Sequence, residues 1–342
     1  MALRNSLRAI SIPAPRGIMY DRTGQALVQN IPTIDLASIP ADLPKEGSVR
    51  EQEKNFLMTV INLDPAVLEP AFSAAQTSSA PILIKSGLTQ EEMLLILGRQ
   101  NELPGIVLVK SAKREYTDGA IFSHVLGYEG KLKQEELEQY PEYGLADIVG
   151  KQRIKKAYES VLRGKNGADR VEVDALGKVK KELGTVDPIP GSDIILNIDA
   201  GLQKKMFDSL SKLLEEKGLK RATAIALNPE TGGVLGMVSL PSYDNNLFSG
   251  GIDQKHYQEL ITDETKPLFN RAISGEYPPG STIKPVIAAA ALSERVVNEH
   301  TEIESRGGIS VGKFFFGDWK AHGFTDIRRA IAVSSDVYFY SV

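Results

Sequence analysis

A proline–glycine turn that leads into an alanine-rich apolar run sets the tightest limit on how this chain can fold. Residues 277–285 read Y-P-P-G-S-T-I-K-P, and the apolar run at 286–292 follows directly. Such a run is buried, and its alanines favour a helix over a strand. If the helix begins near Ser281, the spacing of three residues places the Ser281 hydroxyl and the Lys284 amine on one face, about one hydrogen bond apart.

This pair has the chemistry of an activated nucleophile. A hydroxyl beside an amine base, at a helix N-terminus whose free N–H groups suit a developing anion, can support acyl transfer. The bare pattern S-x-x-K is not specific, because serine also caps helices and lysine is usually solvated. Ser209 with Lys212 and Ser310 with Lys313 match it too. The pattern alone therefore does not show which pair, if any, is catalytic, and other motifs in the chain are needed.

Size and composition indicate globular material with room for two domains. The chain has 342 residues, of which 42% are hydrophobic and 25% charged, enough for two separate cores. Its formal net charge of -4 does not favour binding to nucleic acid, and no such partner is expected. It has no cysteine, and its four histidines lack metal-ligand spacing, so neither a metal site nor a cofactor is expected.

The ends of the chain carry no targeting signal. The longest apolar run, residues 285–292, is far shorter than the roughly 20 residues that a membrane span needs. No basic segment followed by an apolar one opens the chain, as a signal peptide would. The chain as given is therefore expected to be soluble, with a membrane anchor expected upstream of residue 1 and a polar, proline-bearing tether at 1–15.

The next region, 16–190, predicts an α+β domain. Its boundary near residue 190 rests on the chain breakers Pro188, Pro190 and Gly191. Capping boxes that begin at Ser48 and Thr89 predict two amphipathic helices. The remaining expected elements are two extended runs around a turn at 21–24, strands at 81–84, 105–109 and 124–128, and a helix at 154–162 ended by Gly164.

Residues 191–342 predict a second domain in which helices pack on a sheet. A strand at 194–198 precedes a helix that Asp199 caps and Gly218 ends. A hairpin at 223–239 follows, and then the S-x-x-K helix. Further on, Thr325 is expected to cap a short helix that stops at residues 334–336, where a turn between two helices can project Ser334 and Asp336 into a cleft.

These motifs together resemble those of a class B penicillin-binding protein, and the six matching segments span nearly the whole chain. S-x-x-K followed by a second serine motif is the pattern of penicillin-binding proteins and β-lactamases. The matching segments occur in the family's order: Arg16-Gly17 with Asp21-Arg22 and Gly24, then 124–130, Asn228-Pro229-x-Thr231-Gly232, Asn270-Arg271-Ala272, Pro279-Gly280-Ser281-Thr282-x-Lys284-Pro285, and Ser334-Ser335-Asp336.

The resemblance implies a peptidoglycan D,D-transpeptidase that is also a target of β-lactam antibiotics. It implies a pedestal or dimerisation module at 16–190, followed by the first part of a serine acyltransferase domain at 191–342. Ser281 would attack the carbonyl between the two terminal D-alanines of a stem peptide, with the neutral amine of Lys284 as its base. Ser334 would relay a proton to the leaving amine, and Asp336 would hold Lys284, although a carboxylate there favours the ammonium form.

The resemblance also carries three departures. Lys155 stands where the family usually has an acidic residue, so a buried ion pair is expected to be altered. Asp336 stands where many members have Asn, which favours the elongation branch. No K-T-G or K-S-G triplet follows Ser334; the chain is therefore expected to be a fragment that lacks half of the oxyanion hole and is inactive by itself.

Two other functions remain open from the sequence. One is a β-lactam-hydrolysing or β-lactam-sensing serine protein, although such proteins generally lack a module like 16–190. The other is a non-catalytic envelope scaffold. For a transpeptidase, the expected partners are stem peptides, a membrane glycosyltransferase and elongation-complex proteins, and the expected place is the outer face of the cell membrane, in the periplasm.

Overall fold

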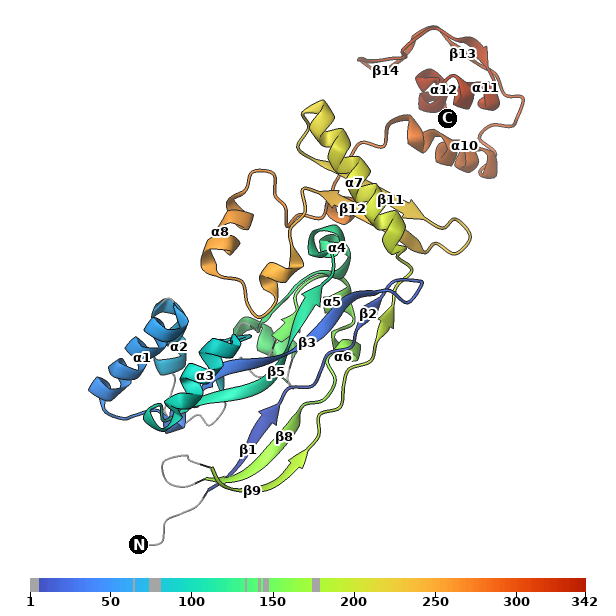
Figure 1. Ribbon diagram of the computed structural model, residues 1–342. Coiled ribbons are helices and arrows are strands. Elements are labelled where there is room, and N and C mark those ends of the chain that lie inside the picture. Colours follow the sequence, from blue (N-terminus) through green and yellow to red (C-terminus); the bar gives the residue numbers. More distant parts are fainter. Residues whose placement is uncertain are drawn as a thin grey trace. The chain divides into compact units, whose positions relative to one another are not determined.

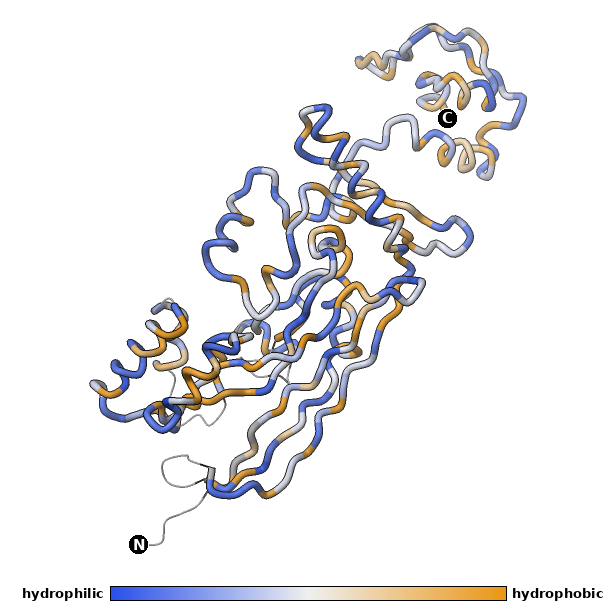
Figure 2. Tube along the Cα trace, in the orientation of Figure 1, coloured by the Kyte–Doolittle hydropathy of each residue, from blue (hydrophilic) through white to orange (hydrophobic). Residues whose placement is uncertain are grey.

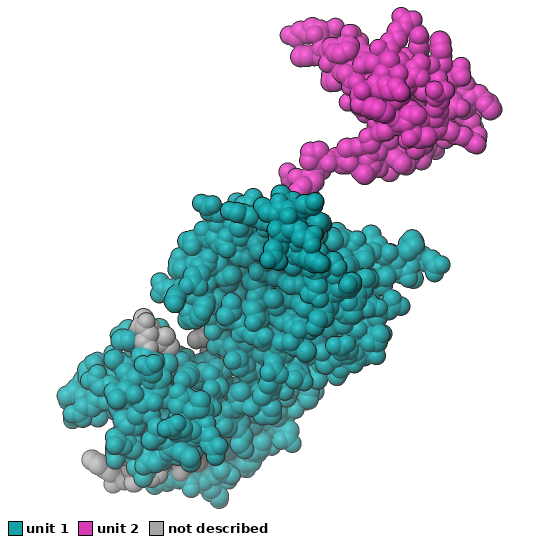
Figure 3. All heavy atoms as spheres, turned by 45° about the horizontal axis from the view of Figure 1, so that its top comes forward, with its two compact units in different colours: residues 1–275 teal, residues 276–342 magenta. Residues whose placement is uncertain are grey.

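The chain folds into two compact units. The computed structural model describes residues 6–63, 65–73, 81–132, 134–140, 143, 148–173 and 179–342. Unit 1 is Met1–Gly275 and unit 2 is Glu276–Val342, shown in teal and magenta in Figure 3. Strands and helices occur in both units, so the predicted α+β class is confirmed.

The larger sheet of unit 1 is built around two long antiparallel strands, β3 (Ala26–Ser38) and β5 (Ile106–Tyr116), which pair over the full length of β5 (Figure 1). β4 (Ile82–Lys85) and β2 (Met19–Tyr20) also pair with β3, and β10 (Ile194–Ile195) pairs in parallel with β2. The strands predicted at 81–84 and 105–109 are confirmed, and the second is longer than predicted.

The predicted turn at 21–24 joins β2 to β3 and is confirmed. Asp21 Oδ1 accepts hydrogen bonds from the N–H groups of Thr23 at 2.8 Å and Gln25 at 2.9 Å. Its other oxygen accepts from the Ala200 N–H at 3.2 Å, at the first residue of α7 (Ala200–Lys217). The buried carboxylate thus ties the hairpin to the start of a helix far along the chain.

The tether predicted at the N-terminus is wrong for residues 6–12. They form β1 (Ser6–Ile12), which pairs antiparallel with β8 (Gly167–Val173), and β8 pairs with β9 (Val179–Val186) in a separate three-stranded sheet. Pairing here depends on backbone hydrogen bonds, which a polar composition does not prevent. The prolines at 13 and 15 come only after the strand has ended; residues 1–5 lie outside the described residues.

The strand predicted at 124–128 is also wrong, because residues 124–126 are the last turn of the helix α4 (Gly119–Leu126) and the next two residues follow its end. Phe122, Val125 and Leu126 are buried together in one core of unit 1. A short apolar run has the same composition in a buried strand and in a buried helix, so periodicity could not distinguish them. Gly127, with φ of +77°, ends the helix.

The first two predicted helices are present, but only one has the predicted cap. α1 (Gly47–Ile61) and α3 (Gln90–Gly98) pack with α2 (Pro65–Ser73) on a core that includes Leu36 and Ile106. The capping box of α3 is confirmed, with Glu92 N–H donating to Thr89 Oγ1 at 3.2 Å and Thr89 N–H donating to the Glu92 carboxylate at 3.0 Å. α1 begins one residue before Ser48, which therefore caps nothing.

This difference gives a matched pair of substitutions. We expect Thr89→Ala to lower the free energy of unfolding by about 1 kcal/mol, because the α3 N-terminus loses its acceptor. We expect Ser48→Ala to change it by no more than about 0.5 kcal/mol, since the position lies inside the first turn of α1. Urea unfolding followed by circular dichroism measures both, and equal losses would contradict the assignment of the caps.

Glu53 in α1 is a buried carboxyl group. It is 3% exposed, and within the described residues neither of its oxygens has a hydrogen-bond partner. Burial raises the pKa of Glu53 from 4.5 to about 7, against the opposing effect of Arg50. Because the folded-state pKa is raised, the stability that the neutral carboxyl contributes is fully present below pH 4.5 and is lost as the pH rises through 7.

We therefore expect Glu53→Gln to change how stability depends on pH. The wild-type chain should lose stability relative to this variant as the pH rises from about 4.5 to 7, and urea titrations across that range measure the difference. Glu51→Gln on the same helix is the control, because the Glu51 side chain is 62% exposed. Parallel pH profiles for wild type and Glu53→Gln would contradict the prediction.

Five charged side chains meet in the interior of unit 1. Arg16 donates to Glu159 at 2.9 Å, and Glu129 Oε1 lies 2.7 Å from Lys155 Nζ and 3.5 Å from Arg114 Nε. Burial, with Arg114 and Arg16 nearby, lowers the pKa of Lys155 well below its ordinary value. In this chain Lys155 pairs with Glu129, and Glu159 is the acidic partner of Arg16. The expectation that this ion pair differs from that of the family stays a prediction.

The helix predicted at 154–162 is interrupted at Tyr158 and forms α5 (Arg153–Ala157) and α6 (Glu159–Leu162). Gly164 follows with φ of +72°, the left-handed conformation expected of a helix-ending glycine. The other short elements of this region are β6 (Glu129–Lys131), β7 (Ile148–Gly150), and the 3₁₀ turns Pro40–Asp42, Gln100–Glu102 and Gln134–Gln139.

The rest of unit 1 follows the sequence more closely. Asp199 accepts the Leu202 N–H at 2.9 Å and caps α7, which Gly218 ends with φ of +63°. β11 (Ala222–Leu227) and β12 (Val234–Leu240) form the predicted hairpin, whereas the strand predicted at 194–198 is only Ile194–Ile195. The remaining elements are the 3₁₀ turn Asn245–Phe248, α8 (Gln254–Thr262) and α9 (Arg271–Ser274).

Unit 2 packs three helices around one small core. The 3₁₀ turn η5 (Gly280–Ile283) leads into α10 (Lys284–Ser293), and α11 (Ile327–Ala332) and α12 (Asp336–Ser341) follow later. Hydrophobic residues line α10 and α12 in Figure 2. The core buries Ala288 of α10, Ala330 of α11, and Tyr338 and Phe339 of α12. Two hairpin-like pairs lie between the helices: β13 (Ile303–Ser305) with β16 (Gly323–Thr325), and β14 (Gly308–Val311) with β15 (Phe314–Gly317).

The cap predicted for α11 is off by one residue. Asp326, not Thr325, accepts the Arg329 N–H at 2.7 Å, whereas Thr325 is buried and donates to Ile303 O at 3.3 Å. Among the described residues of both units, no helix combines the length and the apolar character that crossing a membrane requires.

Candidate active site

The proline–glycine turn presents Ser281 at the surface and turns Lys284 inward. Gly280 has φ of +57°, a conformation that glycine adopts without strain, and the chain then forms one 3₁₀ turn before α10 begins at Lys284. Ser281 is exposed, while Lys284 is 6% exposed among residues of the unit 2 core. The sequence placed the helix start correctly to within one turn.

The second motif lies in the turn between α11 and α12. Ser334 has φ of +55°, which brings its side chain out of the helical path. Ser335 takes the capping role, accepting the Tyr338 N–H at 3.3 Å. This division of roles leaves Ser334 and Asp336 free to meet α10, as predicted from the position of the turn.

A chain of hydrogen bonds joins the four predicted site residues. Ser334 Oγ donates to Ser281 Oγ at 2.7 Å, and Lys284 Nζ donates to Ser334 Oγ at 3.2 Å. Lys284 Nζ also donates to the Ser334 carbonyl at 2.6 Å and to Asp336 Oδ1 at 2.6 Å. All four residues belong to unit 2, so the arrangement is contained in one compact body.

One detail of the prediction differs from the structure. The spacing of Ser281 and Lys284 was expected to place them a hydrogen bond apart, yet among the described contacts Ser334 stands between them. A buried ammonium group needs several acceptors, and the second motif supplies three within reach. Ser281 is therefore connected to Lys284 through Ser334.

The other candidate pairs do not build such a site. Ser209 and Lys212 lie on α7, where Lys212 is exposed and faces Glu216 at 3.7 Å. Ser310 lies on β14 and Lys313 on the turn that follows it. Within the described residues, no group of three or more His, Asp and Glu side chains is placed to hold a metal ion.

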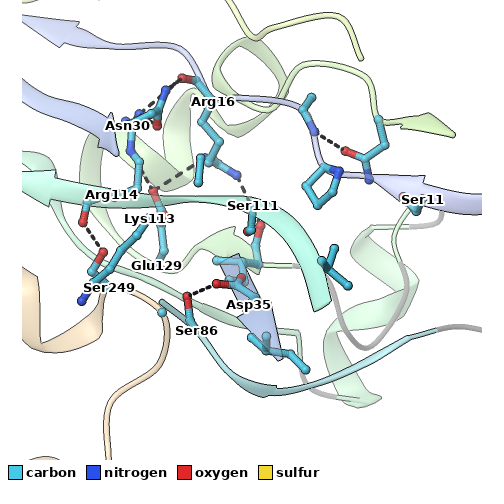
Figure 4. A pocket seen from close by; sticks show the side chains of 18 of the residues that line it. Ser11, Arg16, Asn30, Asp35, Ser86, Ser111, Lys113, Arg114, Glu129 and Ser249 are labelled. Atoms are coloured by element: carbon cyan, nitrogen blue, oxygen red, sulfur yellow. Dashed lines mark hydrogen bonds and ion pairs between the residues drawn. The ribbon is translucent and has the colours of Figure 1, made fainter. Parts of the chain in front are cut away.

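Unit 1 has a cavity of about 360 Å³, shown from close by in Figure 4. Its polar groups are engaged with one another. Asn30 donates to Arg16 O at 2.7 Å, and Asp35 accepts from Ser86 Oγ at 3.1 Å and from Gly87 N–H at 2.7 Å. Serines and Lys113 line the cavity, but within the described residues no hydrogen bond joins Lys113 to one of them. The candidate active site is therefore the cluster in unit 2.

Comparison with known proteins identifies the family of the chain. The family profile described as Penicillin-binding Protein dimerisation domain matches residues 11–196, and the profile described as Penicillin binding protein transpeptidase domain matches residues 222–342. The division between the two compact units at Gly275 falls inside the second match. The boundary predicted near residue 190 thus stays a prediction.

Individual relatives resemble nearly the whole chain. Peptidoglycan D,D-transpeptidase MrdA of Haemophilus influenzae is 35% identical over 99% of this chain and 52% of its own length, and MrdA of Escherichia coli K12 is 33% identical over 99% and 54%. A solved complex between penicillin-binding protein PBP2 and MreC from Helicobacter pylori matches with a TM-score of 0.80 and 30% identity, covering 98% of this chain and 62% of that one. The chain spans about half the length of the curated relatives that it matches. It belongs to the penicillin-binding protein family, in the group that joins a dimerisation domain to a transpeptidase domain.

Proposed function

We propose that this chain carries the acyl-accepting serine of a peptidoglycan D,D-transpeptidase that cross-links stem peptides during cell elongation. The observation that carries the proposal is the hydrogen-bonded series from Ser281 through Ser334 and Lys284 to Asp336. It supplies an exposed nucleophile, a proton relay and a buried amine, which acyl transfer through a serine ester needs. The name of the MrdA relatives, peptidoglycan D,D-transpeptidase, supports the reaction.

In the first step, Ser281 Oγ attacks the carbonyl carbon between the two terminal D-alanines. The Ser281 proton passes to Ser334 Oγ, and the proton of Ser334 passes to Lys284 Nζ. When the tetrahedral intermediate collapses, the carbon–nitrogen bond breaks and the relay returns a proton to the departing D-alanine amine. An amine of a neighbouring peptide then attacks the ester carbonyl and loses a proton to the relay. The carbon–oxygen bond of the ester breaks as the relay returns this proton to Ser281 Oγ, which leaves the cross-link and the free serine.

Lys284 can accept a proton only in its neutral form, whereas the Asp336 carboxylate favours the ammonium. The 2.6 Å hydrogen bond between them gives the surplus proton a route to Asp336 Oδ1. That transfer converts a buried ammonium and a carboxylate whose side chain is 32% exposed into two neutral groups, which becomes favourable as the bound peptide displaces water from the site. Asp336 thus both holds Lys284 in place and takes up its proton.

We also propose partners and a location. The relative from Helicobacter pylori was solved in complex with MreC, and we propose an MreC-type elongation protein and a membrane glycosyltransferase as partners of unit 1. Cross-linking acts on a polymer outside the cytoplasmic membrane, so we propose that the protein works at the outer face of that membrane, in the periplasm.

The experiment uses the protein isolated from its own cells, given a synthetic stem peptide that ends in D-Ala-D-Ala and a free D-amino acid as acceptor. Mass spectrometry should find the acceptor joined to the peptide and D-alanine released, and both should disappear in Ser281→Ala. Exchange that survives this substitution would refute the proposed nucleophile. Repeated turnover of benzylpenicillin without exchange of the peptide would favour a β-lactamase-like protein instead.

A further inference from the structure

The segment that carries Ser334 and Asp336 adopts a conformation that needs support from outside. Ser334 is a non-glycine residue with φ of +55°, which costs free energy unless neighbouring contacts hold it. Lys284 contacts this segment, but Lys284 also has to move protons. A second support that takes no part in proton transfer would keep Ser334 against Ser281 throughout the reaction.

Asp318, between β15 and β16, makes such contacts. Its side chain is 0% exposed. One oxygen, Oδ2, accepts hydrogen bonds from Ser335 Oγ at 2.9 Å, from the Val337 N–H at 3.1 Å and from Ser305 Oγ at 3.2 Å. Ser335 and Val337 flank Asp336 in the sequence, so the carboxylate binds the second motif on both sides of this site residue.

The neighbours of Asp318 complete this support. Oδ1 accepts the Trp319 N–H at 2.9 Å and lies 3.6 Å from His322 Nε2. The Trp319 indole Nε1–H donates to Val333 O at 3.1 Å, immediately before Ser334. Burial alone would raise the pKa of Asp318, but hydrogen bonds from the Val337 and Asp336 N–H groups and from Ser335 outweigh it and lower the pKa.

We propose that Asp318 is a positioning residue for the acylation reaction: its buried carboxylate fixes the backbone of residues 333–337 so that Ser334 Oγ stays in contact with Ser281. The proposal rests on the proposed function of Ser281 and adds a residue that touches neither the nucleophile nor its base. Nothing in the sequence pattern singled out Asp318, since its partners lie on β13, at the N-cap of α12 and in the first turn of α12.

Asp318→Asn tests the role of the carboxylate with little change in size. An amide has one acceptor oxygen and one donor nitrogen, while Asp318 receives N–H groups at both oxygens. Hydroxyls can rotate to accept from the amide, but the backbone N–H groups of Val337 and Trp319 cannot. In either orientation of the amide, one of these two N–H groups therefore loses its acceptor.

The first measurement is the acylation of Ser281 by a fluorescent penicillin, on protein isolated from cells that carry each substitution. Resolving non-covalent binding from the acylation step separates a positioning role from general damage. We expect Asp318→Asn to slow the acylation step by about 100-fold, as small misplacements in active sites do, with non-covalent binding nearly unchanged. Asp326→Asn is the matched control, because Asp326 caps α11 and makes no described contact with the second motif.

Ser335→Ala removes one of the hydrogen bonds to Asp318, together with the cap of α12, and is the second variant, in case Asp318→Asn does not fold. We expect it to slow acylation in the same direction by about tenfold. Acylation rates of Asp318→Asn or Ser335→Ala that equal the rate of Asp326→Asn would overturn the proposal.

A second measurement does not depend on activity. Trp319 is the single tryptophan of the 342-residue chain, so its indole N–H gives one resolved nuclear magnetic resonance signal. In Asp318→Asn, hydrogen exchange of this N–H should be faster by about tenfold, because the turn at 333–337 opens more often. If penicillin labelling fails or survives Ser281→Ala, the proposed function fails, while unchanged indole exchange would show that Asp318 does not hold the turn.

Discussion

Lys284→Met is expected to slow the acylation of Ser281 by a fluorescent penicillin by about 10²–10⁴-fold, the usual contribution of a positioned base. The substitution keeps the length of a side chain that is 8% exposed, but it removes the amine that contacts Ser334 and Asp336. Without it, Ser334 has no group to which it can pass the proton of Ser281. Labelling rates are measured on protein isolated from its own cells, after circular dichroism has shown that the variant folds.

Lys313→Met is the control for this prediction, because Lys313 also ends an S-x-x-K pattern but lies on a turn of the β14–β15 hairpin. Its labelling rate should equal that of the wild type. Equal rates for Lys284→Met and Lys313→Met would mean that the amine of Lys284 does not serve as the base.

Glu129→Ala is expected to lower the free energy of unfolding by about 3–5 kcal/mol, because it leaves buried cations without their shared partner. Glu129 Oε1 lies 2.7 Å from Lys155 Nζ, 3.5 Å from Arg114 Nε and 3.6 Å from Arg16 Nε. Of the two carboxylates in this cluster, Glu159 would remain, and it contacts Arg16. Chemical unfolding of unit 1, followed by circular dichroism, measures the loss.

Two further variants test whether charge is the cause. Glu69→Gln breaks an ion pair with Lys54 whose acidic partner is 62% exposed, and it should cost about 1 kcal/mol or less. The double variant Glu129→Leu with Lys155→Met removes both charges of the closest pair and should recover part of the loss. A loss at Glu129→Ala no larger than that at Glu69→Gln would contradict this account of the buried cluster.

The sequence predicted best those features that are encoded locally. The helix α7 carries its own start and stop signals in Asp199 and Gly218, and both act as predicted. The same holds for the capping box at Thr89. In contrast, α4 and β1 depend on contacts with residues far along the chain. Phe122 and Leu126 of α4 pack in a core that distant residues complete, and residues 6–12 form a strand because they pair with β8.

The candidate site shows the same limit. The motifs identified all four residues that the structure brings together, because each motif is a local pattern at a helix start. The order of contacts was not predictable, since Ser334 and Lys284 meet only after α11 and α12 pack on α10. Asp318 was missed for the same reason: its function depends on hydrogen bonds to Ser305, Ser335 and Val337, which no spacing in the sequence records.

The most direct test of the proposed nucleophile is the mass of the peptide that contains Ser281 after the protein, isolated from its own cells, has reacted with benzylpenicillin. The structure predicts one covalent adduct on Ser281, because this hydroxyl is exposed and contacts the relay through Ser334. The adduct should be absent from Ser281→Ala. An adduct on another residue, or one that persists in Ser281→Ala, would contradict the assignment of Ser281 as the acyl-accepting serine.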